Sequence, residues 1–265
     1  MPETSHMLSL NISLPQLQLF FLVFLRVGAI LMSIPVFDSS SIPIFFKITL
    51  AFAASILLFP MLNLEPVPVQ PDMVTLGVNV VGEIFIGLVI GFSVKLIFAG
   101  VQLAGQLAGY QMGMALANVM DPSGSEQVPL LAQFTNLFGL LVFITINAHY
   151  WFIKALNYSF QVVPPLSASF SGALAEHVIK MSANMFVIGI QVGAPVIAVL
   201  LITSVAFGLI ARTVPQMNVF IVAMPLKIGV GLLFLGLSLP YFSAFLQKIF
   251  GGLGQNLIVM LKAMS

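Results

Sequence analysis

The sequence contains no cysteine and very little charge. Among its 265 residues, nine are basic and eight acidic, 6% together, and these charges stand singly along the chain. A soluble domain carries about 25% charged residues, so a chain this poor in charge cannot cover a water-facing surface. Without cysteine, the chain has no disulfide and no thiolate chemistry. The scattered basic residues also form no basic patch, and we expect no binding to nucleic acid.

Enzyme signatures are missing as well. The sequence has no GxxxxGK(S/T) phosphate loop, no HExxH metal-binding helix and no GxSxG nucleophile turn. Of the three histidines, His6, His149 and His177, only the last has a neighbouring carboxylate, Glu176, and none has a second histidine at ligand spacing. We therefore expect no enzyme, no metal site and no cofactor, and interpret the histidines as structural or interfacial.

Apolar residues dominate what remains. With 60% hydrophobic residues and a mean hydropathy of +1.12, the chain belongs to the membrane class. Its length allows about six to eight helical spans of roughly 20 residues each, within a single integral-membrane unit. We expect no removable secretory signal, because the first basic residue is Arg26, inside the first apolar run. The composition thus predicts an all-α, multi-pass membrane protein.

The first apolar runs predict a helical hairpin. Residues 14–34 end at Pro35, and residues 44–62 return after a short turn. Residues 63–72 form a stiff, proline-rich connection through which no helix can continue.

Two later runs are too long for one membrane crossing. Residues 73–120 and 176–211 both exceed the roughly 20 residues of a span. We expect the first to kink or fold back and the second to kink at Pro195. A further segment, residues 128–160, is interrupted by a polar and aromatic cluster at 147–151, which is typical of a membrane–water boundary.

Single charges lie inside the apolar runs at Arg26, Glu83 and Lys95. An unpaired charge in lipid costs several kcal/mol, so each is expected to face a partner in the protein, or water. Such charges often mark function, but a structural ion pair between subunits meets the same requirement.

Small residues recur at helical spacing in two places. Gly105, Gly109 and Gly113 share one helical face, and Gly189 and Gly193 repeat the spacing later. Missing side chains let another backbone approach closely. We expect these faces to need partners outside a single copy of the chain.

A methionine-rich stretch follows the first glycine face and ends at Asp121 and Pro122, where proline disfavours further helix. Methionine is flexible and fills irregular gaps. The stretch is therefore predicted to be a deformable pore plug, although the same residues also fit an ordinary loop between two buried helices. The predicted plug residues are Met112, Met114, Leu116, Asn118, Val119 and Met120.

A polar tip interrupts the last third of the chain. Residues 211–227 carry two basic residues, two prolines and amide side chains between apolar flanks, with no acid, and residues 228–250 continue as apolar helix. The positive-inside rule assigns this tip to the cytoplasm. Its predicted partner-contacting residues are Arg212, Pro215, Gln216, Asn218, Pro225 and Lys227.

Two stretches resemble the FliR family, the export-gate subunits of bacterial flagellar type III secretion. The first contains Gly109, Gln111, Met112, Gly113, Asp121, Pro122, Pro129, Asn147, His149 and Pro164. The second, more specific, contains Arg212, Pro215, Gln216, Asn218, Val219, Phe220, Pro225 and Lys227. The resemblance spans nearly the whole chain. It departs from the family at Ala148 and Ala223, where glycine is commoner, and in a plug run that is aliphatic and methionine-rich.

The resemblance implies kinked helical hairpins that join FliP-like and FliQ-like subunits in a closed, hetero-oligomeric helical export gate. Residues 1–175 would form a FliP-like N-terminal hairpin region with the plug loop, and residues 176–265 a FliQ-like C-terminal helical hairpin. It also implies the bacterial inner membrane and flagellar basal body, unfolded flagellar proteins as export substrates, and an FlhB-like subunit against the tip. Burial against protein neighbours would explain the glycines, prolines and lone charges in the apolar runs.

A secondary transporter or a channel subunit for small solutes is the alternative. Such proteins also have broken helices and midplane charges, and Arg26, Glu83 or Lys95 could then serve a proton or substrate site. The charges are few and do not cluster in the sequence, which favours the export gate.

Overall fold

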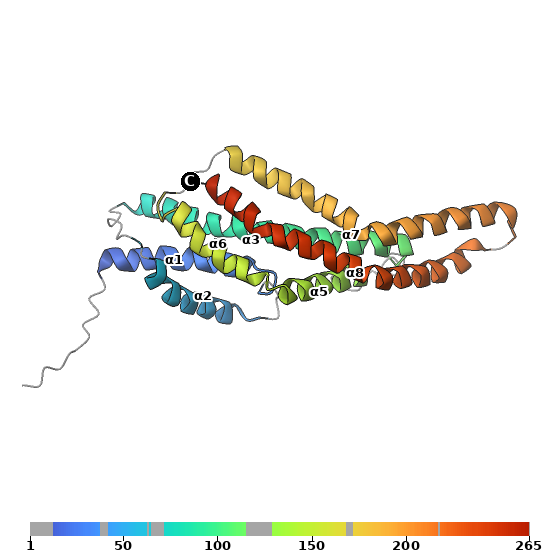
Figure 1. Ribbon diagram of the computed structural model, residues 1–265, viewed down its shortest axis with the longest axis horizontal. Coiled ribbons are helices and arrows are strands. Elements are labelled where there is room, and N and C mark those ends of the chain that lie inside the picture. Colours follow the sequence, from blue (N-terminus) through green and yellow to red (C-terminus); the bar gives the residue numbers. More distant parts are fainter. Residues whose placement is uncertain are drawn as a thin grey trace, which may run out of the picture.

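The computed structural model describes residues 13–37, 42–62, 64, 72–114, 129–167, 172–216 and 218–264. Every regular element in these ranges is helical, which confirms the all-α prediction. The elements are α1 (Leu14–Ser33), α2 (Ile44–Leu58), the 3-10 turn η1 (Phe59–Leu62), α3 (Met73–Met112), α5 (Leu130–Thr145), α6 (His149–Val162), α7 (Gly172–Thr213) and α8 (Val219–Lys262). Figure 1 shows that the helices run lengthwise and that the α7–α8 hairpin extends beyond the others at one end.

The described helices have the length and composition of membrane spans. Five of them are long and apolar enough to cross a bilayer: α1, α2 with η1, α3, α7 and α8. The pair α5 and α6, bent by 68°, adds a sixth span if it is counted as one. The chain is accordingly a multi-pass membrane protein.

The predicted first hairpin is present. Helix α1 begins with a capping box, in which the amide of Ser13 donates to the side chain of Gln16 at 3.1 Å. It ends before Pro35, and α2 returns along it. A Cβ on Gly28 of α1 would lie 3.8 Å from that of Ala51 on α2, so the two helices are in close contact.

Residues 73–120 are predicted to kink or fold back, and the described part of that run does not fold back. Helix α3 is one continuous element of 40 residues, about 60 Å at 1.5 Å per residue. Several of its glycines lie where other helices approach: a Cβ on Gly87 would lie 2.9 Å from the Arg26 carbonyl oxygen of α1. Since α3 is about twice as long as the ~30 Å apolar core of a bilayer, part of it must be sheltered by protein.

The predicted break between residues 128 and 160 is confirmed. Helix α5 ends at Thr145 and α6 starts at His149, and the two meet at 68°. The bend uses Asn147, whose φ of 55° lies in the left-handed region that asparagine tolerates better than most residues.

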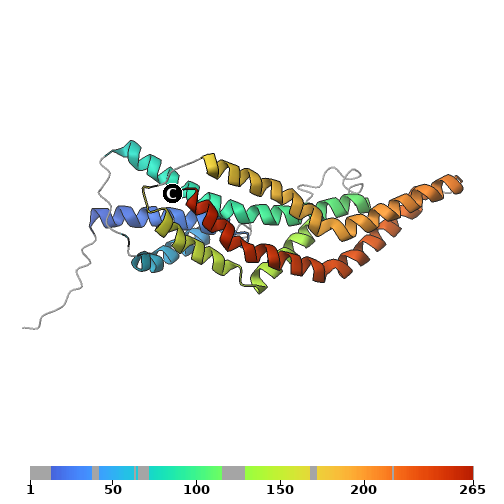
Figure 2. The same cartoon turned by 45° about the horizontal axis from the view of Figure 1, so that its top comes forward.

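Helices α7 and α8 form the longest hairpin. Pro195 lies inside α7, and both views show that α7 and α8 change direction along their length (Figures 1 and 2). An internal proline removes a helix hydrogen bond and favours such a bend. Helix α8 is longer than the predicted apolar helix at 228–250, because it runs continuously through Pro225 and Pro240 from Val219 to Lys262.

Buried charges pair inside the chain. Arg26 of α1 and Glu83 of α3 are 0% and 1% exposed and form an ion pair. The prediction that these charges face partners in the protein is therefore confirmed, but the partner is the same chain and not another subunit.

The apolar core consists of two clusters. The larger is built from residues of α1, α3, α5, α6, α7 and α8. The smaller comprises Ala108, Met112, Leu131, Val196 and Leu200, from α3, α5 and α7, with Ile228 and Leu235 of α8 packed against it. The smaller cluster lies where α3 ends and α5 begins, and this four-helix junction carries Met112, Met114 and the predicted packing glycines at the end of α3.

Candidate functional site

The end of α3 is fixed by a left-handed glycine cap. Gly113 has φ +84°, and the amide of Met114 donates to the carbonyl of Gly109 at 3.1 Å. This conformation suits glycine because a Cβ would be strained there. Gly113, predicted as a packing residue, is therefore the helix terminator that sets where the following segment leaves the junction.

Gly105 brings the backbones of α3 and α5 together. A Cβ on Gly105 would lie 2.6 Å from the carbonyl oxygen of Leu131 and 2.7 Å from Cα of Ala132. Gly109, one turn later, has ordinary space, since its Cβ would be 3.7 Å from the nearest Leu131 side-chain atom. Of the two, only Gly105 must be glycine for α5 to pack this closely.

Helix α7 approaches α3 at the second glycine pair. A Cβ on Gly189 would lie 2.9 Å from Cδ2 of Leu103, and one on Gly193 would lie 3.6 Å from Cβ of Ala104. The expectation that the glycine faces need partners outside one copy is wrong, because α5 and α7 of the same chain occupy them.

Met112 sits against a glycine that the sequence analysis did not single out. A Cβ on Gly231 of α8 would lie 2.8 Å from Cγ and 2.9 Å from Sδ of Met112, so the methionine fills the space left by the missing side chain. Met112 is 0% exposed and belongs to the smaller cluster. Nothing in the spacing of Gly231 marks this contact in advance.

The predicted plug residues divide at the end of α3. Met112 is core, and Met114 is half-buried and packed against the smaller cluster. The remaining predicted plug residues lie outside the described residues: Leu116, Asn118, Val119 and Met120. Their predicted role in a plug stays a prediction.

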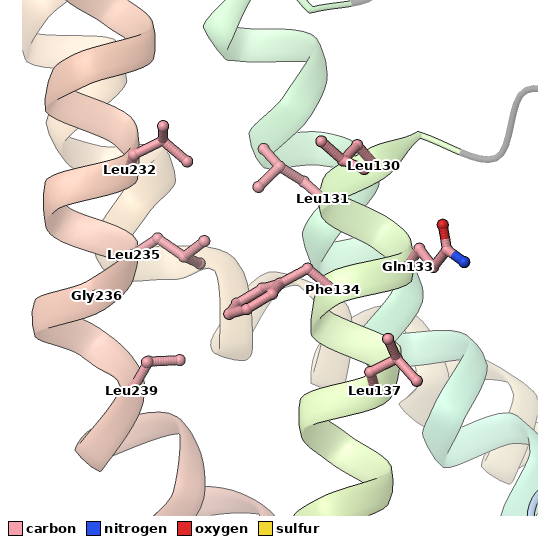
Figure 3. A pocket seen from close by; sticks show the side chains of 9 residues that line it. All are labelled: Leu130, Leu131, Gln133, Phe134, Leu137, Leu232, Leu235, Gly236 and Leu239. Carbon is pink, nitrogen blue, oxygen red and sulfur yellow. The ribbon is translucent and has the colours of Figure 1, made fainter.

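An apolar groove lies between α5 and α8, directly beside the junction. It has a volume of about 510 Å³. Figure 3 shows the ring of Phe134 pointing from α5 toward α8 and Leu235 pointing back, while Gln133 points away. The groove is lined by Leu130, Leu131, Gln133, Phe134, Leu137, Leu232, Leu235, Gly236 and Leu239. The sequence analysis did not predict this groove. The helical spacing of Leu232, Leu235 and Leu239 is the pattern that could have indicated an apolar face on α8.

The polar tip is a short turn at the far end of the α7–α8 hairpin (Figure 1). Arg212 lies in the last turn of α7, Pro215 and Gln216 form the turn, and Asn218 precedes α8. All four are exposed. The turn is shorter than the predicted tip at residues 211–227, because Pro225 and Lys227 lie inside α8. Lys227 is half-buried.

No metal site is formed by the described residues, where no three histidine, aspartate or glutamate side chains gather around one point. The described junction is instead apolar and closely packed, and such a site can hold helices and exclude water. Of the predicted residues, the structure brings together the end of α3 and the glycines of α7, and it places the tip apart from them.

Comparison with known proteins gives one consistent family. Residues 17–253 match the model of the family described as bacterial export proteins, family 1. The flagellar biosynthetic protein FliR of Bacillus subtilis is 34% identical over 235 residues, with 87% of this chain and 90% of that protein covered. FliR of Escherichia coli is 32% identical over 239 residues, with 88% and 89% covered. This chain belongs to the bacterial export protein family that contains FliR.

Proposed function

We propose that this chain is a membrane subunit of a flagellar protein export apparatus. The match to the export family over residues 17–253 carries the proposal. The relatives that cover most of the chain are named flagellar biosynthetic proteins, which supports the flagellar branch.

Its proposed place is an export gate in the bacterial inner membrane, at the flagellar basal body. There it joins FliP-like and FliQ-like subunits around a conduit for unfolded flagellar proteins, with residues 1–175 in the FliP-like part and 176–265 in the FliQ-like part. The α7–α8 hairpin supports such an assembly, because large apolar side chains remain exposed along both helices. They include Ile202 (65%), Leu209 (62%), Ile221 (70%) and Leu237 (69%).

Complementation tests the proposed function. The gene is expressed in a bacterium that lacks its own FliR, and secretion of flagellar proteins into the medium is measured together with swimming. Restored secretion, with copurification of FliP-like and FliQ-like subunits on a tagged copy of this chain, is the expected result. Uptake of a small radiolabelled solute into vesicles that contain this chain alone, without any rescue of secretion, would favour the transporter instead.

The plug proposal concerns the segment that starts after Gly113. A conduit wide enough for an unfolded chain must exclude ions between export events, and an apolar constriction does so by dewetting. Met112 would anchor the segment, because it is held in the core against Gly231. Met114 and the residues that follow would supply the seal.

Charge reversal at the tip is expected to impair export without loss of the assembled complex. Arg212 is exposed at the end of the hairpin, where an FlhB-like subunit would bind, so Arg212→Glu replaces attraction by repulsion at that contact. Secretion should fall, while the amount of purified complex stays that of the parent. Lys248→Glu, at an exposed site on α8 away from the turn, is the matched control and should secrete normally. Loss of the complex in Arg212→Glu would contradict this role of the tip.

A further inference from the structure

A buried guanidinium joins three parts of the chain that are far apart in sequence. Arg26 of α1 donates from Nε to Oε2 of Glu83 on α3 at 2.5 Å. From Nη1 it donates to the backbone carbonyls of Ser159 at 3.0 Å and Val163 at 2.8 Å, where α6 ends. The guanidinium therefore ties the α1–α3 pair to the end of α6.

The end of α6 is suited to receive this cation. The last carbonyls of a helix have no partners within it and carry a partial negative charge, which a positive side chain satisfies. The ring of Phe160 also faces the guanidinium, with Cζ of Arg26 4.3 Å from the ring centroid.

The connection from α6 to α7 lies close to Glu83, the other member of the ion pair. The backbone of Leu166, in this connection, lies near the Glu83 carboxylate. Leu166 has φ +74°, a left-handed conformation that is unfavourable for leucine. This backbone is held in an unfavourable conformation beside a buried charge.

Packing alone attaches α6 weakly to this part of the molecule. Helix α6 packs chiefly on α8 and only slightly on α1. Pro164 and Pro165 follow Val163, the residue after α6, and cannot extend the helix through normal amide hydrogen bonds. The polar contacts of Arg26 and Glu83 therefore join the α6–α7 connection to α1 and α3, together with the apolar contacts of Phe160 and Val163 in the larger core cluster.

We propose that Arg26 and Glu83 form a latch that holds residues 163–167 against α1 and α3. The latch fixes the end of α6 and the point from which the chain continues to α7. It does not hold the rest of the core, because α3 meets α5 and α7 through its own contacts at Gly105 and Ala104. Removing either charge leaves the other buried without its partner, and the connection is then released.

Cysteine labelling tests the latch, because the chain has no cysteine of its own. Val163, in the connection, and Val101, in the second half of α3, are both 0% exposed. Val163→Cys and Val101→Cys are made separately in the full chain, in membranes of cells that produce the whole apparatus. A cysteine is a small apolar residue that replaces valine with little disturbance. Reaction with a small membrane-permeant maleimide is followed over time.

Both cysteines are expected to react slowly when the latch is intact. With Arg26→Gln or Glu83→Gln, labelling of Val163→Cys should be at least about tenfold faster, because local opening becomes easier, while Val101→Cys stays protected. Arg26→Lys keeps the charge but loses the planar fork, and it should give the same contrast more weakly. If the glutamine variants do not accumulate in the membrane, Arg26→Lys is used in their place.

Two results would overturn the latch. One is continued protection of Val163→Cys in the charge variants, since the connection would then be held by packing. The other is faster labelling of both cysteines together, since the ion pair would then support the whole core and not one connection.

Discussion

Replacing Gly105 with alanine is expected to lower the amount of correctly packed chain in the membrane at least about tenfold. The added Cβ would lie 2.6 Å and 2.7 Å from backbone atoms of Leu131 and Ala132, which cannot move aside like the end of a flexible side chain. Overpacking of this kind typically costs about 1–3 kcal/mol. Helices α3 and α5 must separate, and the junction that fixes both ends of the segment between them is lost.

Two alanine substitutions of the same kind serve as controls. A Cβ on Gly109 would make ordinary contacts at 3.7 Å and 3.8 Å, and one on Gly208 of α7 would meet nothing within 4 Å. Alanine favours a helix over glycine by about 1 kcal/mol, so both variants should accumulate as well as the parent.

A disulfide reports the α3–α5 contact directly. A Cβ on Gly109 would lie 3.8 Å from that of Leu131, and disulfides join Cβ atoms at about 3.8 Å. Gly109→Cys with Leu131→Cys should therefore form a disulfide on mild oxidation, and the yield should fall when Gly105→Ala is added. An unchanged yield and unchanged accumulation in Gly105→Ala would contradict the close approach of the two helices.

Local signals were enough to predict the hairpin of α1 and α2 and the break between α5 and α6. Pro35 stops one helix, and the polar cluster around Asn147 interrupts another. Both features change the backbone only at neighbouring residues, so their effect can be predicted from the local sequence. The continuity of α3 could not be predicted in this way, because Gly87 meets α1, Gly105 meets α5 and Gly100 meets α7. A glycine that is covered by another helix looks the same in sequence as one that ends its own helix.

Contacts between distant residues could not be predicted. The charges at Arg26 and Glu83 were expected to need partners, but their spacing of 57 residues does not say that they meet each other. The same holds for Met112 and Gly231, which depend on how α8 crosses the end of α3. The tip was found from composition, yet its limits were too wide, because Pro225 can remain inside a helix that other elements stabilise.

The family resemblance supplied what local patterns lacked. It was carried by motif residues that lie in several separate regions, among them the end of α3, the bend between α5 and α6, and the hairpin tip. The structure places the end of α3 and the tip far apart (Figure 1), and the described residues form no group of three metal-binding side chains, so the sequence patterns alone indicated no catalytic or metal site. The junction explains how α3, α5, α7 and α8 are held together, and the family match indicates a role in protein export.

Weakening the proposed plug is expected to make membranes leak ions while the export complex still assembles. Met114 is half-buried beside the junction, and Leu116 lies in the predicted plug. Replacing both with glycine removes apolar side chains from the proposed constriction. Ions should then pass, because the proposed seal depends on apolar packing and not on charge. Aspartate at the same two positions should leak more, because it holds water in the gap. Ion conductance is measured in cells that express the complex at matched levels.

Two methionines at known positions separate a leak from a folding defect. Met112→Gly should reduce assembly, because Met112 is 0% exposed and fills the space above Gly231. Met73→Gly, at the 89% exposed start of α3, should neither leak nor impair assembly. The seal is assigned to apolar packing after Gly113, so a leak should appear only when residues beyond that cap are changed. If the variants at 114 and 116 assemble and remain as ion-tight as the parent, this segment is only a connection between helices, and the barrier belongs to the partner subunits.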